Sequence, residues 1–299
     1  MISFVKDFPF QYGEPDQLSP LITRIIAHNP GPFTFTGSGA YLIGNQKGVA
    51  VIDPGPDLKT HQEALVRHSP GPITDILITH THKDHCGGAD TLKSLTGART
   101  HGMGPHPSPP ENAPPAFEEG ADFSFTPDHV LTDGDEVSGP GWTLTALHTP
   151  GHISNHLCFS LEEENSLFTG DHIMGWATTV VAPPDGNMTD YYASLDLLLA
   201  RQDQRYYPTH GAPIERPQDY VAAIKAHRDQ RDRSILAALS SVPKSIIEIT
   251  KEVYTDIDPA LHVAASFNVR AHLERHLGLG TVAQVNENYI LTPPAQHQP

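Results

Sequence analysis

The segment HTHKDH, residues 80 to 85, places four side chains that can bind a transition metal within six residues. In an extended backbone His80 and His82 point the same way, and Asp84 and His85 follow as the chain turns. Imidazole and carboxylate groups suit zinc, and a catalytic zinc typically has three protein ligands and one position open for water. This cluster cannot fill two metal sites alone, so further ligands are expected from elsewhere in the chain.

Three more candidate ligands lie in separate short motifs: His152 in HTPGH, Asp171 in FTGDH and His210 in YPTHG. Each is expected at the end of a strand and has a glycine as its direct neighbour, which permits the tight turn that aims a side chain at a metal. The alternative is a histidine-rich surface with accidental spacing, or core histidines that each donate to a backbone carbonyl. The seven residues together favour a metal centre over that alternative.

Two cysteines and several further histidines lie near these motifs without being needed as ligands. Cys86 and Cys158 are the only cysteines, so the sequence specifies no disulfide framework and fits a reduced compartment. Cys86 is interpreted as a small buried thiol rather than a ligand. His148 and His172 are expected to have structural roles beside the metal ligands.

The elements predicted around HTHKDH place it at the edge of a sheet. A hairpin is predicted from residue 40 to 55 with its turn at residues 45 to 48, followed by a helix over 60–68, a strand over 73–79 and a helix over 87–95. The cluster therefore lies where a strand is followed by a helix. Ligand sites of α/β sheets gather at the carboxyl ends of strands, so this position favours a functional role over packing.

The remaining sequence predicts further strands and then a helical tail. The proline-rich stretch 104–117 is expected to be an exposed loop, because proline removes backbone donors. Strands are predicted at FSF, HVL, WTLTALH, HLCFS, SLFTG and RYYP, with a helix over 189–201. Helices over 218–239, 245–253 and 261–277, then a ribbon turning at 286–288, give the order of a winged-helix unit. The predicted domains are residues 1–212 and 213–299.

The charge of the chain argues against long duplex nucleic acid as a partner. The formal net charge is −16, and residues 215–299 carry 9 Lys and Arg against 10 Asp and Glu, without a basic stripe. Nucleic-acid binding normally uses clustered basic residues. The N-terminus has no signal-peptide pattern and no apolar run approaches the length of a membrane span, so a cytoplasmic protein without a membrane partner is expected.

The four metal motifs, in this order, resemble the metallo-β-lactamase superfamily over about residues 20 to 212. The segments FTGDHIMGWATTVV, DYYASLDLLL and YTDIDPALHVAASFNVRAHLERHLGLG extend the resemblance to the β-lactamase-like endoribonuclease group, which carries a C-terminal winged-helix domain. The resemblance implies an α/β fold, an αββα sandwich followed by a small winged-helix-like domain. It also implies two zinc ions per chain.

The resemblance assigns the ligands and the supporting residues. His80, His82 and His152 would bind the first zinc, Asp84, His85 and His210 the second, and Asp171 would bridge them. Asp53 would fix the ring of a ligand histidine. His156, in HISNH, would face the cleft to bind substrate or donate a proton, and Asp84 would orient the nucleophile or pass a proton onward. Iron is the rival metal, because persulfide dioxygenases keep similar motifs.

Several activities remain open on this basis. A small ester, thioester or amide-like substrate is favoured over single-stranded RNA, partly because some fungal relatives are thioesterases and because the expected cleft lining is apolar and neutral. That lining is expected from Trp176, Thr178, Thr179 and the turn at residues 183 to 186. A glyoxalase II-like thioesterase, a true β-lactamase and a non-catalytic regulator are weaker candidates. The tail is expected to pack over the cleft or to form the interface of a homodimer.

Overall fold

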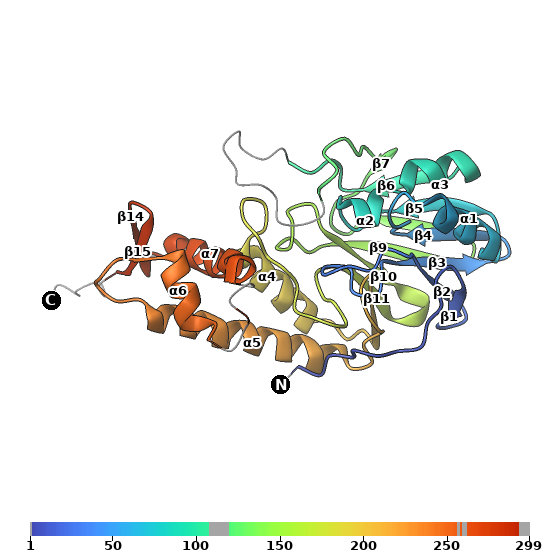
Figure 1. Ribbon diagram of the computed structural model, residues 1–299. Helices are drawn as coiled ribbons and strands as arrows, with labels where there is room; N and C mark the ends of the chain where they lie inside the picture. Colours follow the sequence, from blue (N-terminus) through green and yellow to red (C-terminus); the bar gives the residue numbers. More distant parts are fainter. Residues whose placement is uncertain (1, 108–119, 256–257, 259–261, 293–299) are drawn as a thin grey trace.

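The computed structural model describes residues 2–107, 120–255, 258 and 262–292. Two β-sheets lie face to face with helices on their outer sides, and the helical tail extends from one end of this sandwich (Figure 1). The predicted αββα arrangement followed by a winged-helix-like unit is confirmed.

The first sheet has seven strands in the order of the sequence. They are β1 (Pro15–Gln17), β2 (Ile22–Ile26), β3 (Gly39–Asn45), β4 (Gly48–Ile52), β5 (Ile73–Leu77), β6 (Arg99–Gly102) and β7 (His129–Val130). The strands from β1 to β4 are antiparallel, whereas those from β4 to β7 are parallel. The carboxyl ends of β4, β5 and β6 therefore meet at one edge of the sheet.

The second sheet has five strands in the order β12, β11, β10, β9, β8. Their bounds are β8 (Glu136–Gly139), β9 (Trp142–His148), β10 (Leu157–Leu161), β11 (Ser166–Gly170) and β12 (Arg205–Pro208). The β11 and β12 pair is parallel and the other pairs are antiparallel. The ends of β9, β11 and β12 consequently point to the same edge of the sandwich.

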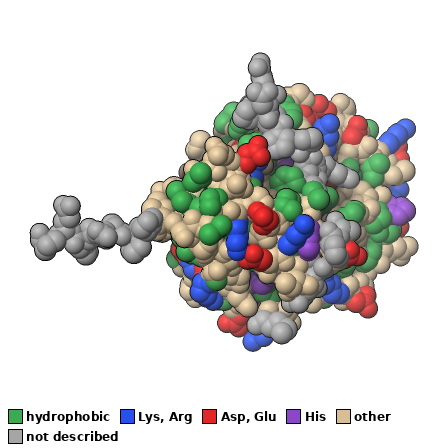
Figure 2. All heavy atoms as spheres, turned by 60° about the vertical axis from the view of Figure 1, so that its left-hand side comes forward, with side chains coloured by type: hydrophobic (Ala, Val, Ile, Leu, Met, Phe, Trp, Pro, Cys, Tyr) green, Lys and Arg blue, Asp and Glu red, His purple; other side chains and the backbone are tan. Residues whose placement is uncertain are grey.

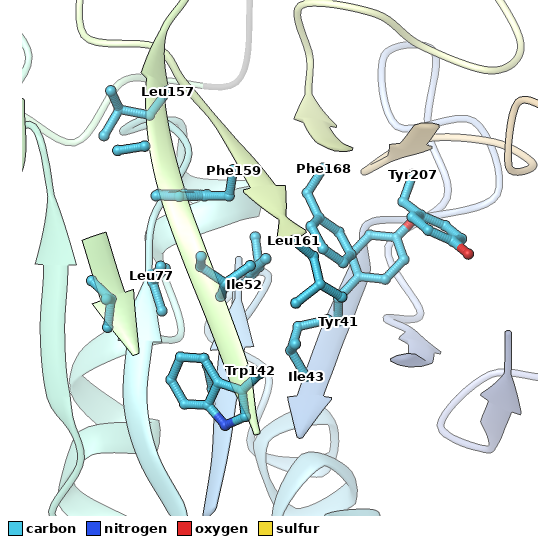
Figure 3. Close-up of a cluster of buried hydrophobic side chains, with 14 of the residues drawn as sticks. Tyr41, Ile43, Ile52, Leu77, Trp142, Leu157, Phe159, Leu161, Phe168 and Tyr207 are labelled. Carbon is cyan, nitrogen blue, oxygen red and sulfur yellow. The ribbon is translucent and has the colours of Figure 1, made fainter. Parts of the chain in front are cut away.

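Large apolar side chains from both sheets fill the space between them (Figure 3). Tyr41 of β3, Trp142 of β9, Phe159 of β10 and Phe168 of β11 are each at most 1% exposed. Removing such a side chain from water contributes about 1.5–3 kcal/mol relative to an exposed position. The Trp142 indole also donates to the carbonyl of Gly48 (3.2 Å), which satisfies its one polar group.

Helices cover the outer faces of the sandwich. Helix α1 (Lys59–His68) and α3 (Ala89–Thr96) pack on the first sheet, and α2 (Lys83–Cys86) is a single turn after β5. Helix α4 (Met188–Leu199) packs on the second sheet, and η1 (Glu162–Glu164) joins β10 to β11. These helices thus bury the outer apolar face of each sheet.

In its described residues the tail contains three helices and a small sheet. Its elements are α5 (Pro217–Ala238), β13 (Lys244–Ser245), α6 (Ile246–Val253), α7 (His262–Gly278), β14 (Val282–Val285) and β15 (Asn288–Leu291), with β15 between β13 and β14. Val221 and Ile224 of α5 and Ala271 of α7 belong to the same apolar cluster as α4. The core therefore continues across the predicted domain boundary at residue 213.

One expectation about local structure is wrong, and several elements were not expected. The segment FSF is not a strand, because the Asp122 carboxylate accepts from the backbone N–H groups of Ser124 and Phe125 (2.8 and 3.1 Å) and folds a turn there. The helix predicted over 87–95 is confirmed as α3, and the single turn α2 before it was not predicted. Strands β1, β2, β6, β8 and β13 were not predicted. Most of the proline-rich stretch, from residue 108 to its end at residue 117, lies outside the described residues.

Candidate metal centre

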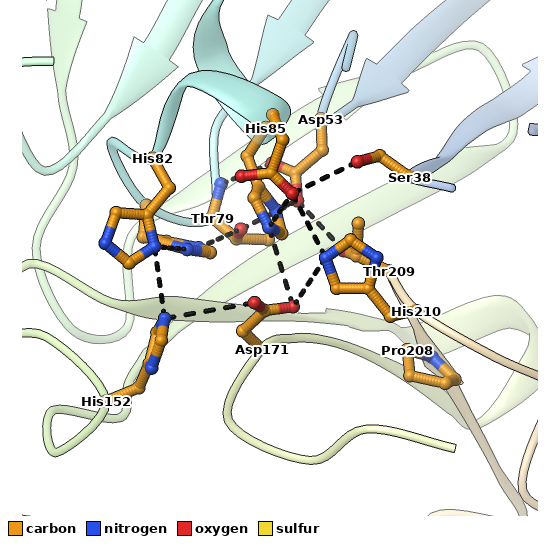
Figure 4. Close-up of polar contacts among 12 residues, drawn as sticks. Ser38, Asp53, Thr79, His82, His85, His152, Asp171, Pro208, Thr209 and His210 are labelled. Atoms are coloured by element: carbon orange, nitrogen blue, oxygen red, sulfur yellow. Dashed lines mark hydrogen bonds and ion pairs between the residues drawn. The ribbon is translucent and has the colours of Figure 1, made fainter. Parts of the chain in front are cut away.

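The seven predicted ligands come together at one edge of the sandwich, where strands of both sheets end. Figure 4 labels five of them: His82, His85, His152, Asp171 and His210. The HTHKDH segment follows β5, with Asp84 and His85 on α2. His152 follows β9, Asp171 comes directly after β11, and His210 follows β12. All seven side chains belong to residues that are at most 8% exposed. Burial of so many polar groups in one place needs a strong interaction to compensate for lost hydration.

Three histidines form the first set of ligand atoms. His80 Nε2 lies 2.9 Å from His82 Nδ1, and His152 Nε2 lies 3.2 Å from the same atom. The Oδ2 atom of Asp171 lies 3.9 Å from His152 Nε2. Ligand atoms about 2.1 Å from a tetrahedral zinc ion are roughly 3.4 Å apart, so these separations fit one ion.

The second set faces the other oxygen of Asp171. His210 Nε2 lies 3.2 Å and His85 Nε2 lies 3.5 Å from Oδ2 of Asp84. The Oδ1 atom of Asp171 lies 3.4 Å from His210 Nε2 and 3.5 Å from His85 Nε2. Asp171 therefore presents one oxygen to each set, as a carboxylate between two cations would.

Two buried atoms of the second set support a metal site there. His85 Nε2 and Asp171 Oδ1 have no hydrogen-bond partner in the described part of the chain, although both are buried. An unsatisfied buried polar atom costs about 1–3 kcal/mol. A cation bound between them would satisfy both, so the residues present fit a metal at this position.

The electrostatics differ between the two sets. Burial and the nearby imidazoles of His85 and His82 hold the pKa of His80 well below its usual range, and burial and His152 lower the pKa of His82 to about 3. These rings are therefore neutral, which is the form that binds metal. Burial would lower the pKa of His85 as well, but the carboxylates of Asp84 and Asp171 outweigh it and raise that pKa well above the usual range. The second set thus attracts positive charge.

Asp53 supports the second set from behind, as the sequence predicted. Its Oδ2 accepts from His85 Nδ1 (2.7 Å), from Thr79 Oγ1 (2.7 Å) and from Thr209 Oγ1 (3.1 Å), while Oδ1 accepts from the N–H of Thr79 (2.8 Å). Its backbone has a φ of +51°, a left-handed conformation that is uncommon outside glycine. The carboxylate fixes the hydrogen of His85 on Nδ1, which leaves Nε2 free to face the metal site.

Backbone carbonyls and one hydroxyl hold other ligands in place, and these partners were not predicted. His152 Nδ1 donates to the carbonyl of Val180 (2.7 Å), and His210 Nδ1 donates to the carbonyl of Gly37 (3.2 Å). The Ser38 hydroxyl donates to Oδ2 of Asp84 (3.1 Å). Main-chain acceptors depend on the path of distant loops, so no residue type marks them.

His156 does not face the cleft, contrary to the expectation from the resemblance. It is fully buried; its Nε2 accepts from the N–H of Asp171 (3.2 Å), and its Nδ1 donates to Thr149 Oγ1 (2.9 Å). Burial, together with His172, holds the pKa of His156 well below its usual range. A neutral ring of this kind supports the backbone of Asp171 and is closed to substrate.

The additional histidines and Cys86 lie around the centre without joining it. His148 Nε2 donates to the carbonyl of Ser154 (2.9 Å), in line with a structural role. His172 is fully buried and its ring lies 4.7 Å from that of Tyr191, measured between centroids. Burial raises the pKa of the Cys86 thiol, as expected for a buried side chain rather than a ligand.

A cleft opens over the ligands and is mostly apolar. It has a volume of about 180 Å³ and is lined by the ligands His82, Asp84, His152, Asp171 and His210 together with Pro32, Phe33, Thr34, Met174, Trp176, Ala177, Thr178 and Val180. Trp176 and Thr178 line it as predicted. Thr179 is buried beneath it instead, and the turn at residues 183 to 186 is not part of this lining.

Comparison with known families decides what kind of protein this is. The model of the metallo-beta-lactamase superfamily matches residues 34–210, more than half of the chain and all seven ligands. The chain belongs to the metallo-β-lactamase superfamily. The beta-lactamase associated winged helix domain matches residues 245–287 within the tail. The protein is accordingly a metallo-β-lactamase superfamily hydrolase with a cluster of metal-binding His and Asp residues and a C-terminal winged-helix domain.

Individual relatives cover much of the chain. A beta-lactamase-like protein 2 homolog from Caenorhabditis elegans is 33% identical over 265 residues, which is 87% of this chain and 85% of that protein. An atrochrysone carboxyl ACP thioesterase from Cryptosporiopsis sp. is 30% identical over 233 residues, 76% of this chain and 65% of the relative. A β-lactamase domain protein from Burkholderia ambifaria shares the metallo-β-lactamase fold, with a TM-score of 0.77 over 96% of both chains at 20% identity.

Among the helices of the described residues, none has both the length and the apolar character needed to cross a membrane.

Proposed function

We propose that this superfamily member is a dinuclear zinc hydrolase that cleaves a small ester, thioester or amide-like substrate. The observation that carries the proposal is Asp171, whose two oxygens face two separate sets of ligand atoms below an apolar cleft. All ligand atoms are imidazole nitrogens or carboxylate oxygens, a set that suits zinc. Two zinc ions held there would supply Lewis acidity and a hydroxide nucleophile at neutral pH.

The side chains of the centre have distinct tasks in this proposal. Asp84 lines the cleft and is fixed by the Ser38 hydroxyl, so it can orient the attacking nucleophile and take its proton. Asp53 and the carbonyl of Val180 keep the rings of His85 and His152 in their ligand orientation. His156 takes no part in proton transfer because it is buried behind Asp171.

The lining of the cleft supports an uncharged acyl substrate. Phe33, Met174, Trp176 and Val180 form an apolar wall beside the ligands, and no Lys or Arg lines the cleft among the described residues. A phosphodiester strand would need cationic groups along its path. The face of the tail in Figure 2 carries acidic, basic and apolar side chains side by side, without a basic stripe. The named thioesterase activity of a relative is in keeping with acyl transfer to water.

The test is a parallel assay of the zinc-loaded protein on acyl-thioesters, aryl esters and single-stranded RNA. We expect turnover of a thioester or ester that is lost when zinc is chelated and restored when zinc is returned. Asp84→Ala should lower kcat by about 10³-fold, since it removes a cleft-facing acid/base and ligand. Asp75→Asn is a matched control, because this buried aspartate pairs with His101 (2.9 Å) away from the centre. Cleavage of RNA without turnover of any acyl substrate would contradict the proposal.

A further inference from the structure

Helix α5 of the tail holds the cleft wall at two points. The wall is formed by residues 173–180, called the cleft segment below. The Tyr220 hydroxyl donates to the carbonyl of Met174 (2.8 Å), and the Arg228 guanidinium donates through Nη2 to the carbonyl of Thr179. Tyr220 and Arg228 are two helical turns apart on α5, so they lie along one face of the helix. The two contacts fall at opposite ends of the cleft segment.

The position of Arg228 is itself tightly determined. The residue is 2% exposed, its Nη1 donates to Oδ1 of Asn268 on α7 (2.8 Å), and its guanidinium lies 5.2 Å from the ring centroid of Tyr191 on α4. Asn268 in turn donates to the hydroxyl of Tyr254 (2.6 Å). These partners are neutral groups, and burying a charge among neutral groups is costly. An apolar side chain of similar volume would pack there at lower cost, so a specific contact explains the arginine better than packing does.

The contact made by Arg228 leads directly to the metal ligands. Thr179 Oγ1 donates to the backbone carbonyls of Asp171 (2.7 Å) and His172 (2.9 Å). The next residue, Val180, provides the carbonyl that accepts from His152 Nδ1 (2.7 Å). Two adjacent residues of the cleft segment therefore support His152 of the first set and the backbone of Asp171.

We propose that the tail positions the metal centre and its cleft: Arg228 is a positioning residue of the ligand His152, and Tyr220 is a positioning residue of the cleft wall. Arg228 acts on His152 through Thr179 and Val180, and Tyr220 fixes Met174 at the other end. The tail, through α5, is then a structural part of the active site. This inference rests on the proposed metal site but not on the identity of its substrate.

The first experiment measures zinc affinity of the full chain by competition with a chromogenic chelator. Arg228→Met keeps an apolar stem of similar length but removes both donated hydrogen bonds. We expect the affinity for the zinc ion of the first set, which includes His152, to fall by about tenfold, the lower end of the range for residues that orient ligands. Arg233→Met on the same helix is the matched control, because Arg233 is exposed, and it should bind zinc as the wild type does. Arg228→Lys should recover part of the loss.

A second experiment reports on the cleft segment without any substrate. The chain has two tryptophans, of which Trp142 is 1% exposed and Trp176 lies half-buried in the cleft segment. Quenching of tryptophan fluorescence by acrylamide therefore reports mainly on Trp176. We expect stronger quenching in Tyr220→Phe and in Arg228→Met, and unchanged quenching in Arg233→Met. Tyr220→Phe should leave zinc affinity unchanged, because Met174 does not contact a ligand through its carbonyl.

The outcomes separate this inference from the proposed function. Wild-type zinc affinity in a folded Arg228→Met variant, with unchanged quenching, would overturn the inference even if the enzyme hydrolyses thioesters. A tenfold loss of zinc affinity would support it even if no acyl substrate is turned over. If Arg228→Met does not fold by circular dichroism, Asn268→Ala loosens Arg228 while keeping its charge and should show a smaller loss. No loss in folded Asn268→Ala and Arg228→Lys would also overturn it.

Discussion

Replacing Asp53 with asparagine should selectively weaken the second metal site. The aspartate accepts four hydrogen bonds in a fully buried position, of which the one from His85 Nδ1 (2.7 Å) sets the tautomer of the ligand ring. An asparagine that keeps its oxygen on the Thr79 N–H turns its NH₂ group toward His85. That geometry favours the His85 tautomer with hydrogen on Nε2, the atom that faces the metal, and so blocks the ligand.

The expected magnitude is a loss of about 10- to 100-fold in affinity for the second zinc ion, or roughly 1.4–2.7 kcal/mol. The first set, which has its own acceptors, should retain its zinc. The assay is a chelator competition followed by elemental analysis, which should find about one zinc per chain at limiting metal. Asp75→Asn, which breaks the buried pair of Asp75 with His101 away from the metal centre, should retain two zinc ions per chain. Equal loss of both ions, or wild-type affinity in Asp53→Asn, would refute the reasoning.

Three further changes test the support of the site and the fold. In urea unfolding, Gly170→Ala should destabilise the protein by more than about 2 kcal/mol, because φ at Gly170 is +48° and the added Cβ would lie 2.6 Å from His156 Nε2. Gly97→Ala is the control: it has open space around it and should cost about 1 kcal/mol. Phe159→Ala should cost about 3–5 kcal/mol in the same assay. Burial lowers the pKa of His61 to about 4, so as pH drops this histidine is protonated in the unfolded chain before it is protonated in the folded one. The free energy of unfolding should therefore fall between pH 6.5 and pH 4, by up to about 3 kcal/mol. His61→Gln should lose less stability over this range, and an equal loss would contradict the role of His61.

The coming together of the seven candidate ligands could be predicted because each lies in a short motif whose residue types are typical of metal binding. HTHKDH needs only local backbone geometry to present four donors, and glycines mark the turns at His152, Asp171 and His210. The division into two sets came from resemblance rather than from spacing. The structure brings the same residues together around Asp171.

The parts that escaped prediction depend on contacts between distant segments. Strand β2 is fully buried on both faces, so it lacks the alternation that marks a strand at a surface. The cleft-facing role expected of His156 is excluded by its burial beneath Gly170 and Asp171, which sequence cannot show. The contact of Arg228 with Thr179 joins residues 49 positions apart and ends on a backbone carbonyl, which carries no side-chain signal.

The most direct test of the central claim is the metal content of the purified protein, measured by elemental analysis after dialysis against metal-free buffer. Two ligand sets sharing Asp171 predict about two zinc ions per chain, falling to one or fewer in Asp171→Ala. Iron in place of zinc, or a single ion that Asp171→Ala leaves unchanged, would contradict the dinuclear zinc centre.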